Sequence, residues 1–261
     1  MYLNQDFSYC QARLQARYAN LPDAAEWQRL AGVRTLAAFL EEARRGPLRP
    51  WVKRLSATSD ALVLERGLRT LAAELADEAA RWVPRPWRAT VAWTAWLPYL
   101  PVFEHLADTA QPKRHADWAS ADPRLRALVS DAGEPDPDAL ERAGLRMLRD
   151  APRPDQIPAR WADEWRNRWP PARQGWTRDL EAFTARLVAH LSAFRHADPA
   201  DAWNLRQALR ERLRLQFHQS MLAPVTVHIY LALILLDLER LRAELLRRAL
   251  FTPSPDTGQG H

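Results

Sequence analysis

The stretch from Thr177 to Phe251 constrains the fold most, because its apolar residues recur with the period of an α-helix. They stand three or four residues apart at Leu180, Phe183, Leu187, Leu191 and Phe194. This spacing places them on one helix face. Asp198-Pro199 interrupts the pattern, a second helix follows from Asp201, and a long apolar helix runs from Pro224. We therefore predict three consecutive helices that pack on one another.

The composition extends this prediction to the whole chain. Alanine, leucine and arginine dominate, whereas the β-branched residues that favour strands are scarce. Eight glycines and twenty prolines indicate many helix ends joined by stiff connections. The 261 residues suffice for a substantial core. We predict an all-α protein, built as an array of pseudo-repeated helical units.

The basic residues admit two interpretations. There are 37 of them, all arginine except Lys53 and Lys113, against 32 acidic residues, so the net charge is only +5. Arginines and acids alternate at helical spacing, as in Glu239, Arg240, Arg242 and Glu244. This mixing is typical of a solvated helix face with local ion pairs, which we favour. The alternative is a surface that binds nucleic acid or another polyanion.

Three features bear on location. Cys10 is the only cysteine, which excludes an intrachain disulfide and favours a reducing compartment. It lies in an apolar helical series, so we expect a core residue rather than a reactive thiol. The N-terminus lacks a signal-peptide pattern, and the apolar run from Val225 to Leu238 is too short to cross a bilayer. We expect a cytoplasmic protein, with peripheral membrane association left open.

Local signals predict where helices begin and end. We predict N-terminal helix caps at three places: a capping box of Asp23 with Glu26, a cap at Thr35, and a cap at Ser59-Asp60. Pro98 and Pro101 fall inside a predicted helix over 86–107, so we expect a kink or split near Leu97. One helix is predicted over 138–149, and the proline-rich segment 151–158 is predicted to be extended. The expected organisation is a helical unit over 1–110, a connection over 111–158, a second unit over 159–251 and a disordered tail over 252–261.

Trp161, Trp165 and Trp169 stand four residues apart, on one face of a predicted helix. We favour packing of this face against a neighbouring helix. The alternative is a set of interface aromatics that anchor a partner, because tryptophan is enriched at interface hot spots.

Two segments of the chain resemble each other. Residues 64–97 align with residues 180–213 without a gap. The identical positions include Leu64 with Leu180, Leu71 with Leu187 and Trp87 with Trp203. Both segments have an apolar helix, a proline-containing break and a second helix with tryptophan near its start. This order favours a repeated helical unit, in which each copy buries its face against the next; two merely similar hairpins remain the alternative.

Catalytic and metal-binding motifs are absent from the sequence. The seven histidines form no HExxH pair, and there is no glycine-rich phosphate loop, nucleophile elbow or cysteine–histidine spacing. His190 is expected to be a core residue rather than a ligand. We therefore predict no catalytic residue, no cofactor and no metal site, and expect that the protein is not an enzyme.

The order of segments resembles the C subunit of V-type and archaeal-type ATPases, also called the d or AC39 subunit. The opening Tyr2-Leu3-Asn4 and the Glu-x-x-Leu pattern at Glu65 are similar to the family. The segment from Asp201 through Trp203, Asn204 and Arg206 is similar to its Asp-x-x-Asn-Leu-Arg closure. The segment from Asp237 to Arg242 is similar to its final helix, without the asparagine. The chain is shorter than members of the family and looks short of one repeat.

The resemblance implies a non-catalytic helical connector that joins the central stalk of a rotary ATPase to its membrane rotor ring, in ion transport. It implies protein subunits as partners and gives the motif residues a structural or partner-contacting role. It also implies a concave surface between the repeats. Two alternatives remain from the residues themselves. One is an arginine-rich nucleic-acid-binding protein, and the other is a helical-bundle enzyme or small-molecule binder with a pocket lined by Trp87, Trp93, Trp96 and a buried histidine.

Overall fold

The computed structural model describes residues 6–107, 121–130, 135–149 and 153–251, and these ranges confirm the all-α prediction. Within them there are helices and no strand, apart from an isolated bridge between Val129 and Pro135. The predicted disordered tail and the motif Tyr2-Leu3-Asn4 lie outside the described residues. Residues 111–120, 131–134 and 150–152 of the predicted connection over 111–158 also lie outside the described residues.

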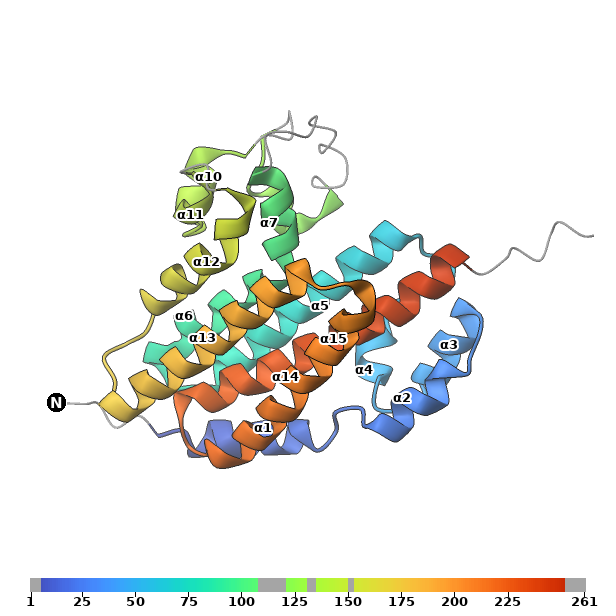
Figure 1. Cartoon of the computed structure of the whole chain (residues 1–261), viewed down its shortest axis with the longest axis horizontal. Helices are drawn as coiled ribbons and strands as arrows, with labels where there is room; N and C mark the ends of the chain where they lie inside the picture. The colour runs from blue at the N-terminus through green and yellow to red at the C-terminus, as the bar shows by residue number, and fades with distance from the viewer. Residues whose placement is uncertain (1–5, 108–120, 131–134, 150–152, 252–261) are drawn as a thin grey trace, which may run out of the picture.

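The first half of the chain contains one long helix of 22 residues among shorter helices (Figure 1). The helices are α1 (Ser8–Tyr18), α2 (Ala24–Ala31), α3 (Leu36–Ala43), α4 (Arg49–Val52), α5 (Ala61–Trp82), the 3₁₀ helix η1 (Arg85–Trp87), α6 (Arg88–Trp93), the 3₁₀ helix η2 (Thr94–Tyr99) and α7 (Leu100–Ala107).

The second half begins with short helices and ends with three long ones. They are α9 (Pro123–Arg126), α10 (Pro137–Arg142), α11 (Arg146–Arg149), the 3₁₀ helix η3 (Pro154–Gln156), α12 (Ile157–Arg166), α13 (Gln174–His196), α14 (Pro199–Gln219) and α15 (Pro224–Phe251). Among the described helices, including α15, none reaches the length and hydropathy that a bilayer crossing requires.

The predicted caps form in the structure. Side chains of Asp23, Thr35 and Asp60 accept hydrogen bonds from the first-turn amides of α2, α3 and α5. Each bond satisfies an amide that has no partner within its helix. The split near Leu97 is also confirmed, because the 3₁₀ segment η2, which contains Pro98, separates α6 from α7.

Two local predictions are wrong. The helix predicted over 138–149 is divided into α10 and α11 at Gly144, whose φ of 73° is incompatible with a continuous helix. Within the segment 151–158, residues 154–158 are helical and not extended, because η3 starts at Pro154 and Pro158 lies in the first turn of α12. A proline at a helix start loses no intrahelical hydrogen bond, which explains why it begins these helices instead of preventing them.

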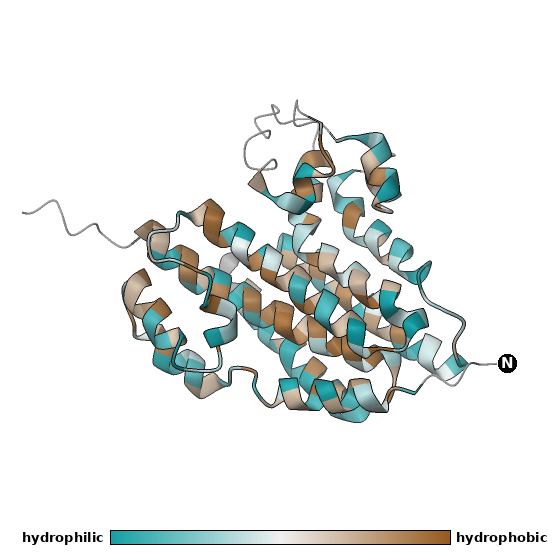
Figure 2. Ribbon diagram, turned by 180° about the vertical axis from the view of Figure 1, so that it is seen from behind, coloured by the Kyte–Doolittle hydropathy of each residue, from teal (hydrophilic) through white to brown (hydrophobic). Residues whose placement is uncertain are grey.

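Helix α15 is the central element of the fold. It packs against α5, α14, α13, α1 and α3 (Figure 1). The contacts of Glu65 with Arg242 and of Trp82 with Tyr230 show that α5 and α15 run antiparallel. Hydrophobic residues concentrate along the helices at the centre of the molecule (Figure 2). One contiguous core joins both predicted helical units, so residues 6–107 and 153–251 pack together rather than separately.

The two copies of the proposed repeat have a similar order of elements, but aligned residues differ in burial. Helix α5 and helix α13 both pack on α15, and a proline separates each from the next helix. Leu64 and Leu180 are both fully buried. Trp87, however, is buried, whereas its counterpart Trp203 is 42% exposed. The second helix of the first copy is broken into η1, α6 and η2, while α14 is continuous.

Candidate functional site

The antiparallel pair α14 and α15 presents a surface of arginines and tryptophan. Residues Trp203, Arg206, Gln207 and Arg210 of α14 stand three or four residues apart, so they share one helix face. Leu236 and Arg240 of α15 complete the boundary of a hollow of about 20 Å³. We call these six residues the α14–α15 face. The hollow is about the size of a water molecule, which is too small for an organic ligand.

Arg240 lies between two tryptophan rings. Its guanidinium carbon is 4.6 Å from the ring centroid of Trp27 and 4.8 Å from that of Trp203. Trp27 belongs to α2 and is buried, whereas Trp203 is half-exposed. Cation–π attraction therefore connects α2, α15 and α14 and holds the exposed Trp203 ring in place.

Arg210 forms an ion pair with Asp237 at the interface of α14 and α15. The Asp237 side chain is completely buried, and one of its oxygens accepts a hydrogen bond from Arg210. Arg210 also donates to the carbonyl oxygen of Pro22 at 3.3 Å, which ties the segment between α1 and α2 to α14. The second Asp237 oxygen has no hydrogen-bond partner among the described residues. The Arg210 charge is therefore partly compensated inside the fold.

A chain of ion pairs extends from Arg206 across the molecule. Arg206 lies 3.3 Å from Glu239, which lies 3.7 Å from Arg242. Arg242 in turn pairs with Glu65 of α5 at 2.5 Å. Glu65 lies 3.6 Å from Arg69, and Arg69 pairs with the buried Asp122 at 3.2 Å. Charges on α14, α15, α5 and α9 thus form one network, in which each guanidinium has an acidic neighbour.

Partial burial affects the guanidinium groups of this surface. Loss of hydration lowers the pKa of Arg206, Arg210 and Arg240 below that of a free guanidinium. Arginine nevertheless stays protonated at neutral pH. Burial, together with the nearby Arg206, also lowers the pKa of His190, which is therefore neutral at pH 7. The positive charge of the face comes from arginine.

No protein-family model, curated protein or solved structure matches this chain. The candidate residues must therefore be judged by their positions in the fold.

The motif residues taken from the resemblance fall into two groups. Asp201, Trp203 and Asn204 are exposed near the start of α14. Arg206 and Arg242 are half-buried and lie in the ion-pair network, and Asp237 is buried beneath the α14–α15 face. Trp203 and Arg206 lie on the α14–α15 face with Arg210 and Arg240. Arg240 contacts Trp203, and Arg210 pairs with Asp237. Sequence reasoning did not single out Arg210 and Arg240, although the spacing of residues 203, 206, 207 and 210 on one helix is the signal that could have found Arg210.

The predicted tryptophan stripe is mainly a packing feature. Trp161 and Trp165 are buried and stacked with a 5.7 Å centroid separation. The ring of Trp169 is half-buried and lies 5.3 Å from that of Trp165. Because the first two side chains have no solvent exposure to offer a partner, the interface interpretation does not apply to them.

The tryptophans proposed for a small-molecule pocket are also packed. Trp87 and Trp93 are buried, and Trp96 is half-buried. Among the described histidines only His228 of α15 is buried, and its ring lies 4.7 Å from that of Trp165 at a steep angle. These residues line neither the hollow on the α14–α15 face nor the wider one described next. Within the described ranges, no group of three or more His, Cys, Asp or Glu residues is arranged to hold a metal ion.

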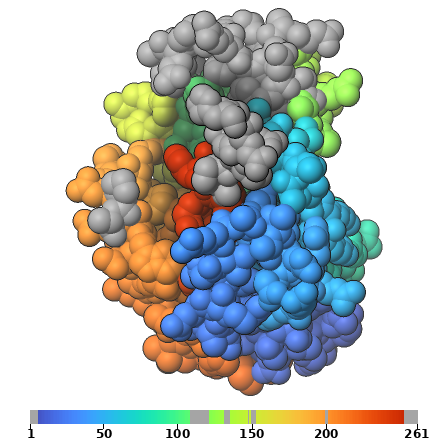
Figure 3. Space-filling model, turned by 90° about the vertical axis from the view of Figure 1, so that its right-hand side faces the viewer, coloured from blue at the N-terminus to red at the C-terminus, as the bar shows by residue number. Residues whose placement is uncertain are grey.

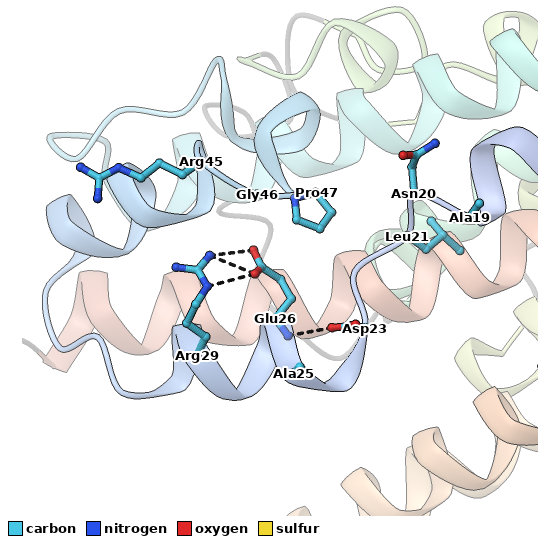
Figure 4. Close-up of a pocket in the computed structure, with 10 residues that line it drawn as sticks. All are labelled: Ala19, Asn20, Leu21, Asp23, Ala25, Glu26, Arg29, Arg45, Gly46 and Pro47. Atoms are coloured by element: carbon cyan, nitrogen blue, oxygen red, sulfur yellow. Dashed lines mark hydrogen bonds and ion pairs between the residues drawn. The ribbon is translucent and has the colours of Figure 1, made fainter.

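A wider hollow of about 640 Å³ lies beside α2 (Figure 4). Its polar groups are engaged within the protein. Glu26 accepts two hydrogen bonds of 2.9 Å from one Arg29 nitrogen, and Asp23 caps α2 through the Glu26 amide. Arg45 pairs with Glu41 at 2.9 Å. Because these charges already have intramolecular partners, we find no group here positioned for chemistry.

Proposed function

We propose that this protein is a non-catalytic helical connector that binds other protein subunits. The resemblance to the C subunit of V-type and archaeal-type ATPases supplies the assembly: a rotary ATPase, in which the connector links the central stalk to the membrane rotor ring. The partners would then be the stalk and ring subunits. The location would be cytoplasmic, on the inner face of the membrane.

The observation that carries this proposal is the exposure of the motif segment on α14. Asp201, Trp203 and Asn204 are exposed, and Trp203 is the only tryptophan in the exposed class among those described. A segment used solely for packing would bury its largest side chain. An exposed tryptophan beside arginines has the composition of an interface hot spot.

The contacts of α15 with several other helices also support a connector. Helix α15 passes through the centre of the molecule, and its ion pairs and cation–π contacts join it to α2, α5 and α14. Contacts distributed along one helix transmit force between distant surfaces without local unfolding, which is the mechanical requirement of a link between moving subunits.

The arginine distribution favours protein contacts over nucleic-acid binding. Many arginines pair with acids on the same or a neighbouring helix, as Arg29 does with Glu26 and Glu42 and Arg54 does with Glu74. Such pairing reduces the uncompensated positive charge that would attract a phosphate backbone.

The test is affinity capture of the tagged full chain from gently solubilised native membranes, with identification of the proteins that co-purify. We expect rotor-ring and central-stalk subunits in amounts comparable with the bait. Replacing the exposed motif residue Asn204 with alanine should reduce their recovery, while Arg54→Gln, an exposed change outside α14, should not. Recovery of the protein alone, or with nucleic acid, would contradict the connector function.

A further inference from the structure

Arg240 differs from the other arginines of the α14–α15 face in having no ion-pair or hydrogen-bond partner among the described residues. The acid that acts on its charge is Glu244, and that carboxylate pairs with Arg247 and Arg248 instead. Arg206 and Arg210 have Glu239 and Asp237, respectively, as neighbours. The two tryptophan rings contact the Arg240 guanidinium, but aromatic rings accept none of the strong in-plane hydrogen bonds that its N–H groups can donate.

This arrangement leaves a half-buried cation with unused donors beside an exposed aromatic ring. A carboxylate matches such a group best, because charge-assisted hydrogen bonds to guanidinium are short and frequently paired. The narrow hollow between Arg240, Arg206 and Gln207 admits a single small group rather than a ring. The exposed Trp203 beside it offers an apolar surface to the residues that flank the carboxylate.

We propose that the α14–α15 face binds an acidic segment of a protein partner, with a carboxylate of that segment on Arg240 and Arg206 and an apolar side chain on Trp203. This inference rests on the proposed connector function, and it assigns the chemistry of the partner at the same surface. A nearby acid favours a protein over a nucleic acid. Glu239, which lies 3.3 Å from Arg206, would repel a continuous phosphate backbone, whereas a single inserted carboxylate contacts the arginines alone.

The first experiment measures binding of the full chain to a fluorescein-labelled helical peptide by fluorescence anisotropy. The peptide carries glutamate and leucine side by side on one face, and its control has glutamine in place of every glutamate. We expect the glutamate peptide to bind more tightly than the control, with affinity that falls as salt is raised. Equal affinity for the two peptides, or no binding of the glutamate peptide at low salt, overturns the inference.

Three substitutions locate the binding site. Trp203→Ala and Arg240→Gln should each weaken binding of the glutamate peptide at least about tenfold, as expected for hot-spot residues. Arg212→Gln provides the matched control, because this exposed arginine of α14 lies on the opposite helix face. Trp203 is exposed, so its variant should fold even if loss of the Arg240 stacking on Trp27 destabilises the other. An equal loss in Arg212→Gln would show nonspecific attraction and overturn the inference.

A single-stranded oligonucleotide of matched charge tests the other class of partner. If it binds more tightly than the peptide and responds to the same substitutions, the face binds nucleic acid and the proposed partner is wrong.

The two proposals can fail independently of each other. If rotor and stalk subunits are captured and Trp203→Ala does not change their recovery, the acidic-segment inference alone is refuted. If the peptide binds but those subunits are not captured, the rotary-ATPase connector alone is refuted.

Discussion

The two halves of α15 treat buried polar groups in opposite ways. From Val225 to Ile234 the helix is buried on every side, among aromatic residues of α5, α12 and α13. Both nitrogens of the buried His228 lack a hydrogen-bond partner among the described residues. From Leu235 onward one side of the helix is exposed, and the buried charges Asp237 and Arg248 both have partners.

In the second half of α15, the buried guanidinium of Arg248 has several hydrogen-bond and ion-pair partners. It donates to the carbonyl oxygens of Val33 and Leu30, at 2.6 and 3.1 Å, and pairs with Glu244 at 2.5 Å. Leu30 lies in the last turn of α2 and Val33 just beyond it, where carbonyls have no partner further along the helix. The C-terminal part of α15 thereby fixes the N-terminal helices, and its end surfaces between them and α13–α14 (Figure 3).

The difference follows from what each side chain can do when it loses water. A histidine can become neutral at modest cost, so burial lowers the pKa of His228 to about 3. An arginine cannot lose its proton at neutral pH, so it must bring hydrogen-bond acceptors with it. The part of α15 from Val225 to Ile234, which we call the dry half, tolerates a neutral ring without a hydrogen-bond partner. The part from Leu235 onward, the polar half, depends on the pairing of each buried charge. Substitutions in the two halves should separate these cases.

The largest expected effect is that of Asp237→Ala. The substitution leaves the half-buried Arg210 without its carboxylate, and breaking a buried ion pair costs about 3–5 kcal/mol. Urea unfolding of the variant measures this loss. The double variant Arg210→Met/Asp237→Leu should recover most of it, because neither charge is then buried alone. Glu211→Ala, at an exposed acid of α14, should change stability by less than about 0.5 kcal/mol. A similar loss in the single and double variants would show that packing, not charge, matters here.

Arg248→Ala should rank next. It removes the side-chain donor to the Val33 carbonyl and one of the donors to the Leu30 carbonyl, which keeps the amide of Val33. A buried carbonyl left without a partner costs about 1–3 kcal/mol. Arg247→Ala is the matched control, since that neighbouring side chain is largely exposed and pairs with the same Glu244. Thermal unfolding compares the two variants. Equal stabilities would contradict a structural role for the buried guanidinium.

Burial of His228 in the dry half of α15 predicts that the stability of the fold depends on pH. The pKa of His228 is lower in the folded chain than in the unfolded one, so the unfolded state binds the proton first as pH falls below about 6.5. Stability is lost between that pH and about 3, by roughly 1 kcal/mol per pH unit. His228→Leu should remove this slope and leave stability at pH 7 unchanged or higher. Unfolding curves at pH 5 and pH 7 test this. An unchanged slope in the variant would assign the acid sensitivity to carboxylates.

The sequence was sufficient for features that depend on near neighbours. The all-α class followed from composition, and the caps at Asp23, Thr35 and Asp60 each act on the amide three residues away. The proline at 98 split its helix as its missing N–H requires. Where the same residue type has two local outcomes, prediction failed: Pro154 and Pro158 begin helices instead of opposing them.

The candidate site depended on distant neighbours, which limited its prediction. Trp203 and Arg206 were named from the resemblance, but the position of Trp203 depends on Arg240, and that of Arg240 depends on Trp27 in α2. No spacing along the chain connects these three residues. The aligned tryptophans Trp87 and Trp203 make the same point, because similar local patterns led to one buried and one exposed ring.

The turn before α15 contains another feature that no pattern revealed. Leu222 has φ of 59°, a left-handed conformation that costs a side chain with a Cβ roughly 1–2 kcal/mol. Its amide donates to the Gln11 side chain of α1 at 3.0 Å, which holds the turn against α1. The Leu222 side chain is half-exposed and contributes little burial.

Leu222→Gly should therefore raise stability, by about 0.5–1 kcal/mol, because relief of strain exceeds the added freedom of the unfolded chain. The gain should be visible as a higher denaturant midpoint with an unchanged slope. Met221→Gly, one residue earlier and similarly exposed, should lower stability, since Met221 does not have a positive φ. If both glycine variants were destabilised alike, the entry into the dry half of α15 would be set by the leucine side chain and not by the backbone of the turn.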